Sequence, residues 1–315
     1  MDRLLIIEQN PESFRRAIQK EIPDLEIFLL EDLEKNPDLL TTVTIFLAGK
    51  PAGRFPEDLL ERAQRLRWVQ SSLAGVDHLV TSPFLRDDVL LTRVGGVFGK
   101  FMAEYVLGYI LYLVLQIARV VDNQKKARWE PFMPGTLEGK TLGILGLGEI
   151  GSEIARKAKA LGMRVLGLKR TQGRFPYVDQ LFLETELPNF LPQVDFLVLT
   201  VPLTPNTRGL LGAPELRLMK REAYLINISR GAVVQEEDLL RALEEKWIAG
   251  AILDVFAQEP LPKESRFWHL DNVLVTPHIS GPDDPAPVSR VFCDNYRRFL
   301  SGGPLRYVVD RRRGY

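Results

Sequence analysis

The chain has little cysteine, little histidine and no excess of charge, and each shortage narrows what the protein can be. Its 315 residues include one cysteine, Cys293, which cannot form an internal disulfide, so we expect a reducing compartment, the cytoplasm. Lysine plus arginine and aspartate plus glutamate each number 41. Because no net charge attracts an anionic polymer or surface, we expect no nucleic acid and no membrane as partners.

Long apolar runs are also missing. The longest uncharged apolar stretch, Tyr105 to Ala118, spans 14 residues, whereas a membrane-spanning helix needs about 20. The stretch therefore predicts a buried helix, and its apolar surface favours a homodimer. The N-terminus lacks the basic, apolar and small-residue order of a secretory signal, so no such signal is expected.

Short apolar runs alternate with amphipathic segments along most of the chain. Apolar positions three and four apart predict helices at Pro11 to Lys20, Pro56 to Leu66, Ile150 to Leu161 and Glu236 to Lys246. Runs typical of strands are Leu4 to Ile7, Thr42 to Leu47, Trp68 to Ser71, Val89 to Leu91, Thr141 to Leu145, Arg164 to Leu168, Asp195 to Val201, Ala223 to Ile228, Ala249 to Val255 and Asn272 to Thr276. Strands that alternate with helices predict an α/β protein with parallel sheets, and the length indicates two domains.

A glycine-rich turn follows the strand Thr141 to Leu145 and opens a helix. Gly146, Gly148 and Gly151, with Glu149 and Ile150 between them, form the pattern G-x-G-x-x-G. In this context the glycines permit a tight turn, a close approach to a pyrophosphate and close packing of helix on strand. The helix N-terminus adds partial positive charge. The segment therefore predicts a dinucleotide site.

The end of the next strand bears on which dinucleotide binds. A site selective for NAD usually has Asp or Glu there to accept hydrogen bonds from the ribose, but this chain has Lys169 and Arg170. Two cations favour the 2′-phosphate of NADP, and arginine has the better shape for it. NADP is therefore the expected cofactor, with NAD as the alternative. Ordinary solvated surface cations would give the same pattern.

Three reactive side chains follow later apolar runs: Arg230, Glu259 and His278. In an open α/β sheet, ligands bind at the carboxyl ends of the strands. A guanidinium binds a carboxylate with two hydrogen bonds, and an imidazole held by a carboxylate can transfer a proton near neutral pH. Each residue taken alone also has an ordinary structural explanation. Together they favour a site for a small oxo or hydroxy acid, and no metal site is predicted.

With these motifs in order, the chain resembles the D-isomer-specific 2-hydroxyacid dehydrogenases, in particular the glyoxylate and hydroxypyruvate reductase branch. The motifs concerned are Leu145 to Gly151, Val201 to Thr204 with Thr207, Asn227 to Gly231, Asp254 to Leu261 and Asn272 to Ser280. The resemblance implies two Rossmann-like domains: a nucleotide-binding, doubly wound parallel sheet of residues 99–281, inserted into a flavodoxin-like substrate domain of residues 1–98 and 282–315.

The resemblance also assigns roles. It implies that Arg230 binds the substrate, that Glu259 supports the histidine, and that His278 donates the proton when a 2-oxo acid is reduced to a 2-hydroxy acid by hydride transfer. It implies substrate binding by the backbone of Leu73, Ala74, Gly75 and Val76. Further cofactor contacts are implied for Val201, Pro202, Thr207, Ile228, Ser229, Asp254 and His278.

One function of another class stays open. Corepressors that resemble this family sense a nucleotide without turnover, so a binding protein is the alternative to an enzyme. The presence of Arg230, Glu259 and His278 together favours the enzyme.

Overall fold

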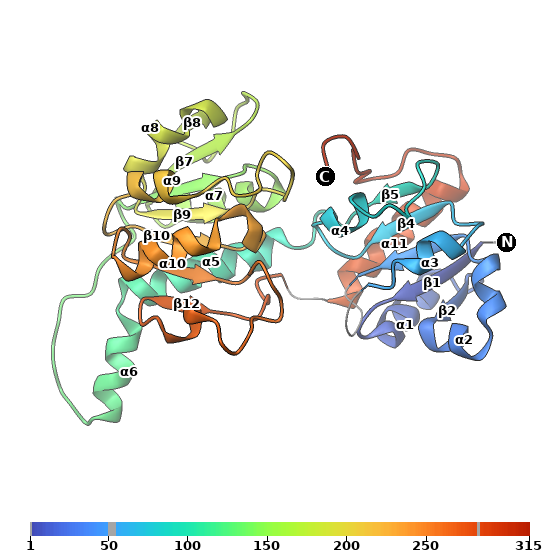
Figure 1. Ribbon diagram of the computed structural model, residues 1–315, viewed down its shortest axis with the longest axis horizontal. Coiled ribbons are helices and arrows are strands. Elements are labelled where there is room, and N and C mark those ends of the chain that lie inside the picture. Colours follow the sequence, from blue (N-terminus) through green and yellow to red (C-terminus); the bar gives the residue numbers. More distant parts are fainter. Residues whose placement is uncertain (1, 50–54, 282–283) are drawn as a thin grey trace. The chain divides into compact units, whose positions relative to one another are not determined.

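The computed structural model describes residues 2–49, 55–281 and 284–315. The chain divides into two compact units, Met1–Val97 with Asp283–Tyr315, and Phe98–Pro282. Each unit contains one parallel sheet (Figure 1). Two parallel sheets, with the second in a segment inserted into the first unit, confirm the predicted fold class.

The first unit has a sheet of five strands in the order β2-β1-β3-β4-β5 within the described residues, the order of flavodoxin-like folds. Its strands are β1 (Arg3–Ile7), β2 (Glu26–Leu29), β3 (Ile45–Ala48), β4 (Trp68–Ser71) and β5 (Leu90–Thr92). Its helices are α1 (Pro11–Glu21), α2 (Leu30–Lys35), α3 (Asp58–Arg62), α4 (Asp77–Val80) and α11 (Pro285–Leu300). Alternate strand residues face opposite sides. Phe46 and Val69 therefore join the core under α3, whereas Trp68 stacks on Phe292 of α11 with ring centroids 5.3 Å apart.

The second unit has a sheet of seven strands in the order β12-β11-β10-β9-β6-β7-β8 within the described residues. This is the doubly wound order in which β6 is central and the chain reverses direction beside it. Its strands are β6 (Thr141–Leu145), β7 (Arg164–Lys169), β8 (Gln180–Leu183), β9 (Phe196–Leu199), β10 (Tyr224–Asn227), β11 (Gly250–Leu253) and β12 (Val273–Val275). Its helices are α5 (Gly99–Val114), α6 (Ile117–Lys125), α7 (Glu149–Ala160), α8 (Leu187–Phe190), α9 (Ala213–Leu218) and α10 (Glu236–Glu244).

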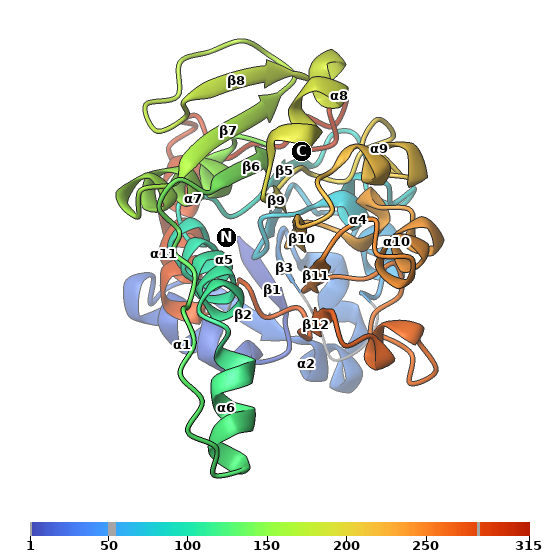
Figure 2. The ribbon, with the colours of Figure 1, turned by 90° about the vertical axis from the view of Figure 1, so that its left-hand side faces the viewer.

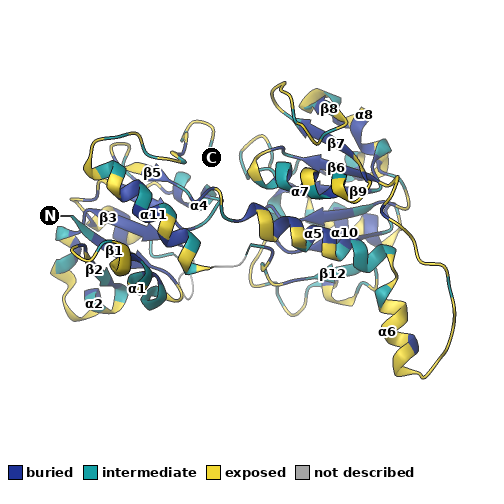
Figure 3. Cartoon of the chain, turned by 180° about the vertical axis from the view of Figure 1, so that it is seen from behind, coloured by how far each residue is buried: buried dark blue, intermediate teal, exposed yellow. Residues whose placement is uncertain are grey.

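Strand residues that alternate along this sheet build its core. Leu197, Leu199 and Leu225 pack in one cluster with Phe190 of α8 and Leu240 of α10. Helices α5 and α7 pack against each other, and Figure 2 shows them together beside β6 in the second unit. Figure 3 shows dark blue, buried strands between helices with yellow, exposed outer faces. Because both faces are covered, the strands are almost entirely apolar.

The helix expected over residues 105–118 is wrong in its extent. Helix α5 ends at Val114 and α6 begins at Ile117, because Gln116 has a left-handed φ of 51° that interrupts the helical hydrogen bonds. Over the described ranges, no single helix is long and apolar enough to cross a membrane. The pair α5 and α6 passes that test together by length and composition, but the two helices are bent by 59° at their break.

Candidate active site

The predicted residues of the second unit lie together at the carboxyl ends of the strands of the seven-stranded sheet. Because all seven strands are parallel, their carboxyl ends lie on the same side. The glycine-rich turn follows β6, Val201 and Pro202 follow β9, and Arg230 follows β10. Asp254 and Glu259 follow β11, and His278 follows β12. The structure therefore places the cofactor motif and the three reactive residues on one sheet edge.

The glycine-rich turn has the geometry that a dinucleotide requires. Gly146 has φ 107°, and a Cβ on Gly151 would lie 2.1 Å from the carbonyl oxygen of Gly146, so any side chain there would break the turn. Gly148 caps α7, and a Cβ there would meet nothing within 4 Å. The open space at the N-terminus of a 12-residue helix fits a pyrophosphate, which main-chain amides and the helix dipole would bind.

One threonine that the sequence analysis did not identify supports this turn. The hydroxyl of Thr200, at the end of β9, donates to the carbonyl oxygen of Gly146 at 2.5 Å. Its only sequence signal is that it directly precedes Val201. Thr207 lies nearby in sequence, but its hydroxyl is used within its own loop, where it donates to Pro202 O at 2.6 Å and accepts from Thr204 N at 2.8 Å.

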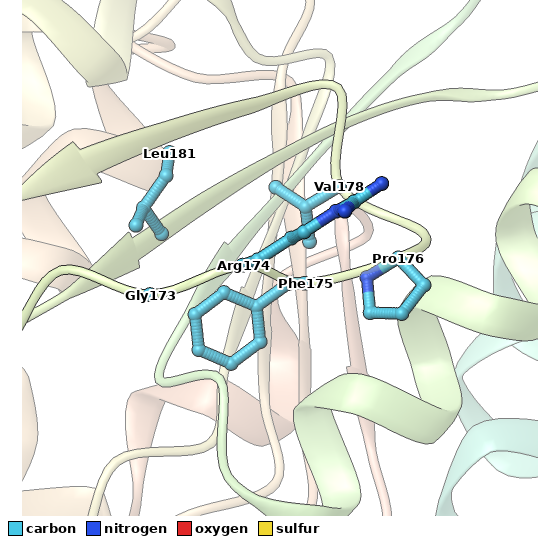
Figure 4. A pocket seen from close by; sticks show the side chains of 6 residues that line it. All are labelled: Gly173, Arg174, Phe175, Pro176, Val178 and Leu181. Carbon is cyan, nitrogen blue, oxygen red and sulfur yellow. The ribbon is translucent and has the colours of Figure 1, made fainter.

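The two cations at the end of β7, Lys169 within the strand and Arg170 after it, differ in their surroundings. The ammonium of Lys169 donates to Leu147 O at 3.2 Å and lies 4.6 Å from the centre of the Phe175 ring, so it is tied to the glycine-rich turn. Arg170 is exposed. The loop that follows surrounds a hollow of about 700 Å³. Its lining residues, shown in Figure 4, are Gly173, Arg174, Phe175, Pro176, Val178 and Leu181.

His278 and Glu259 form an ion pair when the imidazole is protonated. Glu259 Oε2 lies 2.7 Å from His278 Nδ1, and Glu259 Oε1 accepts a hydrogen bond from Phe256 N at 3.0 Å. The side chains of His278 and Glu259 are 27% and 34% exposed, so both can reach a ligand. Since Nδ1 is used by the carboxylate, Nε2 is the nitrogen that remains for chemistry.

The turn after β10 is shaped by a buried amide. Asn227 Oδ1 accepts from Ser229 N at 3.1 Å and from the Ser229 hydroxyl at 2.9 Å, and Asn227 Nδ2 donates to Arg230 O at 3.0 Å. The guanidinium of Arg230 donates to Ser229 O at 2.8 Å and is half-buried. Ile228 and Ser229 are buried. The local contacts therefore fix the backbone from which Arg230 projects.

Asp254 has more partners than the sequence indicated. It is fully buried, and its carboxylate accepts hydrogen bonds from Thr276, Ile279 and Ser280, on either side of His278. Thr276 is further bonded to Tyr105 of α5 at 2.6 Å. Neither Thr276 nor Tyr105 was among the predicted site residues. Thr276 could have been found from its position two residues before His278, whereas Tyr105 lies in an apolar run that signals only burial.

The remaining predicted residues belong to the first unit. Leu73, Ala74, Gly75 and Val76 form the turn between β4 and α4, at the carboxyl end of β4. Leu73 N donates to Ser71 Oγ at 3.1 Å, and Leu73 O accepts from Val94 N at 3.1 Å. Within the ranges that the structure describes, no group of three or more His, Cys, Asp or Glu side chains could hold a metal ion.

Comparisons with known proteins identify the family to which the chain belongs. Residues 107–280 match the family model "D-isomer specific 2-hydroxyacid dehydrogenase, NAD binding domain". The chain is 36% identical over 230 residues to a glyoxylate reductase of Korarchaeum cryptofilum, which covers 71% of this chain and 69% of the relative.

Two solved structures are similar over almost the whole chain. A D-isomer-specific 2-hydroxyacid dehydrogenase family protein of Aeromonas salmonicida has a TM-score of 0.91 and 37% identity, covering 98% of this chain and 99% of its own. An NADPH-dependent glyoxylate/hydroxypyruvate reductase of Sinorhizobium meliloti, in complex with NADP and sulfate, has a TM-score of 0.91 and 34% identity, covering all of both chains. The chain therefore belongs to the D-isomer-specific 2-hydroxyacid dehydrogenases, a family of NAD(P)-dependent enzymes.

Proposed function

We propose that this enzyme reduces a small 2-oxo acid, glyoxylate or hydroxypyruvate, with NADPH, and that His278 is the proton donor. The observation that carries the proposal is the His278–Glu259 pair, 2.7 Å apart, on the sheet edge that also carries the dinucleotide turn. The names of the relatives support the substrate class, since both the Korarchaeum and the Sinorhizobium proteins are glyoxylate reductases.

The residues divide the reaction between them. NADPH supplies the hydride that the carbonyl carbon receives when the cofactor is bound. His278 Nε2 donates a proton to the carbonyl oxygen, and Glu259 holds the imidazole through Nδ1 in the orientation that this requires. Arg230 binds the substrate carboxylate and stabilises the negative charge that develops on the carbonyl oxygen. Oxidation of the 2-hydroxy acid uses the same groups in reverse.

The remaining residues of the proposal come from the turns and loops that follow strands. The backbone of Leu73–Val76 binds the substrate carboxylate, as amides of a tight turn can. Gly146, Gly148 and Gly151, with Glu149 and Ile150, bind the pyrophosphate. Val201, Pro202, Thr207, Ile228, Ser229 and Asp254 provide further contacts to the cofactor.

NADP is preferred over NAD because the end of β7 carries cations in place of an acid. Of the two, Arg170 is the stronger candidate for the 2′-phosphate. Its guanidinium is exposed and can form paired hydrogen bonds to a phosphate, which a lysine ammonium cannot.

The direct test follows the absorbance of NADPH and NADH while purified protein is mixed with glyoxylate, hydroxypyruvate, pyruvate or phenylpyruvate. We expect oxidation of NADPH with glyoxylate or hydroxypyruvate, at a kcat of about 1–10³ s⁻¹. Tight binding of NADPH without turnover on any 2-oxo acid would overturn the proposal in favour of a nucleotide-sensing protein.

A single substitution tests the preference for NADPH over NADH. Arg170→Ala should raise the KM for NADPH by about tenfold or more and leave the KM for NADH almost unchanged, because only NADPH carries the phosphate. Arg164→Ala is the matched control, since Arg164 lies at the opposite end of the same strand. Equal losses with both cofactors would show that Arg170 does not bind the phosphate.

We also propose that the protein is a homodimer that associates through an arm, defined as residues 117–136. The arm consists of α6 and the segment after it, which projects from the sheet of its unit in Figures 1 and 2. Trp129 is 95% exposed and Met133 is 89% exposed. Large apolar side chains that are gathered on one exposed segment are typical of a protein interface.

A further inference from the structure

The carboxylate of Asp254 accepts hydrogen bonds from residues before and after His278, the proposed proton donor. Its Oδ1 accepts from the Thr276 hydroxyl at 2.6 Å and from Ile279 N at 2.8 Å, and its Oδ2 accepts from Ser280 N at 2.9 Å. Asp254 is fully buried, so these donors replace the water that the carboxylate loses. The segment 276–280 is thereby attached to the end of β11 at three points around His278.

The chain of hydrogen bonds continues to α5. A threonine hydroxyl has one hydrogen, and Thr276 gives it to the Asp254 carboxylate, which can only accept. Thr276 Oγ1 therefore accepts from the Tyr105 hydroxyl, 2.6 Å away. Burial raises the pKa of Tyr105 well above its ordinary value, which keeps its hydroxyl a donor. The order of donation is Tyr105 to Thr276 to Asp254.

His278 needs such support, because its backbone has an unusual conformation. Its φ is 54°, in the left-handed region that a side chain with a Cβ rarely occupies. Such a conformation persists only where neighbouring contacts determine it. Here the residues on both sides of His278 are bound to one rigid acceptor, and His278 N donates to Thr276 O at 3.1 Å. The same conformation directs the imidazole to Glu259.

We propose that Tyr105 and Thr276 are positioning residues, which fix through Asp254 the backbone conformation that presents the His278 imidazole to Glu259. A donor that is displaced by about 1 Å loses much of its effect on the rate, so residues that contact no substrate can still set kcat. The positioning itself is a property of the folded chain, and only its effect on kcat rests on the proposed function.

Two pairs of variants test the chain of hydrogen bonds from Tyr105 through Thr276 to Asp254. Tyr105→Phe removes the hydroxyl that donates to Thr276. Tyr109→Phe is its control, because Tyr109 lies one turn along α5 with its ring centroid 4.6 Å from that of Tyr105. Thr276→Val keeps the shape of the side chain and removes its hydroxyl, whereas Thr276→Ser restores the hydroxyl without the methyl group.

The first measurement is amide hydrogen exchange of the peptide that contains Ile279 and Ser280, which does not depend on activity. We expect exchange to accelerate about tenfold or more in Thr276→Val and Tyr105→Phe, and to stay at the wild-type rate in Thr276→Ser and Tyr109→Phe. Unchanged exchange in Thr276→Val, with the protein folded by circular dichroism, would overturn the positioning role whether or not the enzyme acts on a 2-oxo acid.

The second measurement is steady-state kinetics. We expect Thr276→Val to lower kcat about tenfold or more at an almost unchanged KM for NADPH, with Thr276→Ser close to wild type. The double variant Tyr105→Phe/Thr276→Val should lose no more than Thr276→Val alone, because both changes act through one path. Additive losses, or equal losses in Thr276→Val and Thr276→Ser, would contradict the proposal. Wild-type protein without turnover would refute the proposed function alone and leave the exchange result standing.

Discussion

At the residue scale, the two ring nitrogens of His278 have different tasks. Nδ1 is bound to Glu259 at 2.7 Å, so Nε2 is the nitrogen to which the proposed function assigns proton donation. If His278 is the proton donor, His278→Asn removes general acid catalysis while keeping a polar side chain of similar size. We expect kcat to fall about 10²- to 10⁴-fold, with the Kd for NADPH changed little, as measured by steady-state assay and fluorescence titration.

His269→Asn is the control for that substitution. His269 is exposed in the short helical turn before β12, away from the strand ends. Its loss should leave kcat as in the wild type. A His278→Asn enzyme that retained more than about a tenth of the activity would mean that another group, or water, donates the proton.

The sequence favours, as candidate site residues, side chains that come shortly after strands. Arg230, Glu259 and His278 stand at or near strand ends, where a parallel sheet collects functional groups whatever the details of packing. Tyr105 could not be predicted in this way, because it contacts Thr276 across 171 positions of sequence. The same holds for Lys169, whose cation was assigned to the cofactor although the fold also gives it Leu147 O as a partner.

At the scale of the element, two glycines of the glycine-rich turn have different tasks: Gly151 is needed for folding, whereas Gly148 leaves room for a ligand. Gly151→Ala would place a Cβ 2.1 Å from Gly146 O, so the turn would have to open. We expect a loss of stability of about 1–3 kcal/mol together with a loss of cofactor binding. Gly148→Ala meets no neighbouring atom, so it should fold normally.

The contrast between the two glycine variants is the informative result. Gly148→Ala adds a methyl group where the pyrophosphate would approach, and should weaken NADPH binding about tenfold or more with an unchanged melting temperature. Thermal melts and NADPH titrations measure both quantities. Normal NADPH affinity in Gly148→Ala would place the pyrophosphate elsewhere.

Asp195 links the neighbouring strands β9 and β6 at the amino ends of the strands of the same sheet. It lies just before β9, and its carboxylate accepts from Thr141 N of β6 at 2.7 Å and from Lys220 Nζ at 2.8 Å. Burial alone would raise the pKa of this carboxyl. The hydrogen bonds from Lys220 and Thr141 and the charge of Lys220 outweigh burial and leave the pKa below its ordinary value.

The lowered pKa of Asp195 predicts a pH dependence of stability. An unfolded aspartate has a pKa of about 3.9, so the stabilisation is fully present above that pH and is lost as the pH falls through the lower folded value. Asp195→Asn should lower the free energy of unfolding by about 1–3 kcal/mol at pH 7. The difference from wild type should shrink as the pH falls below about 4.

Urea unfolding at pH 7 and at acidic pH measures this difference. Asp271→Asn is a suitable control, because Asp271 is exposed and has no ion pair among the described residues. A deficit in Asp195→Asn that is the same at both pH values would show that the carboxylate charge does not contribute.

The predicted and observed bounds of the strands and helices show which elements can be predicted from local sequence patterns. The central strands β6 and β10 are apolar and flanked by glycine or helix signals, and they were predicted to within one residue. Strands β2 and β8 were missed, because both lie at sheet edges and each begins with an exposed polar residue. The break at Gln116 was missed because neither glycine nor proline marks it.

At the scale of the whole molecule, the arm of residues 117–136 exposes apolar surface that a lone subunit would leave in water. Val120 and Val121 of α6 are more than 40% exposed, in addition to Trp129 and Met133, and Figure 3 shows α6 largely in yellow. The C-terminal end of the arm is bound to α5, because Gly135 N donates to Val114 O at 2.9 Å. Arg119 lies over the Phe132 ring with its guanidinium carbon 4.3 Å from the centroid. These contacts hold the arm in place without covering its apolar side chains.

If this arm forms the dimer interface, shortening its largest side chains should dissociate the dimer. Buried aromatic residues carry much of the affinity of an interface, typically 2 kcal/mol or more each. Trp129→Ala/Met133→Ala should therefore raise the dimer dissociation constant about 30-fold or more, as measured by sedimentation velocity over a concentration series. Trp268→Ala is the matched control, because Trp268 is 49% exposed outside the arm and its indole nitrogen donates to Pro262 O. A wild-type protein that is monomeric at every concentration, or a double variant that dimerises as well as Trp268→Ala, would remove the arm as an interface. The activity of the dissociated variant then shows whether one subunit is sufficient for turnover, since the dinucleotide turn, Arg230, Glu259 and His278 all belong to the same sheet.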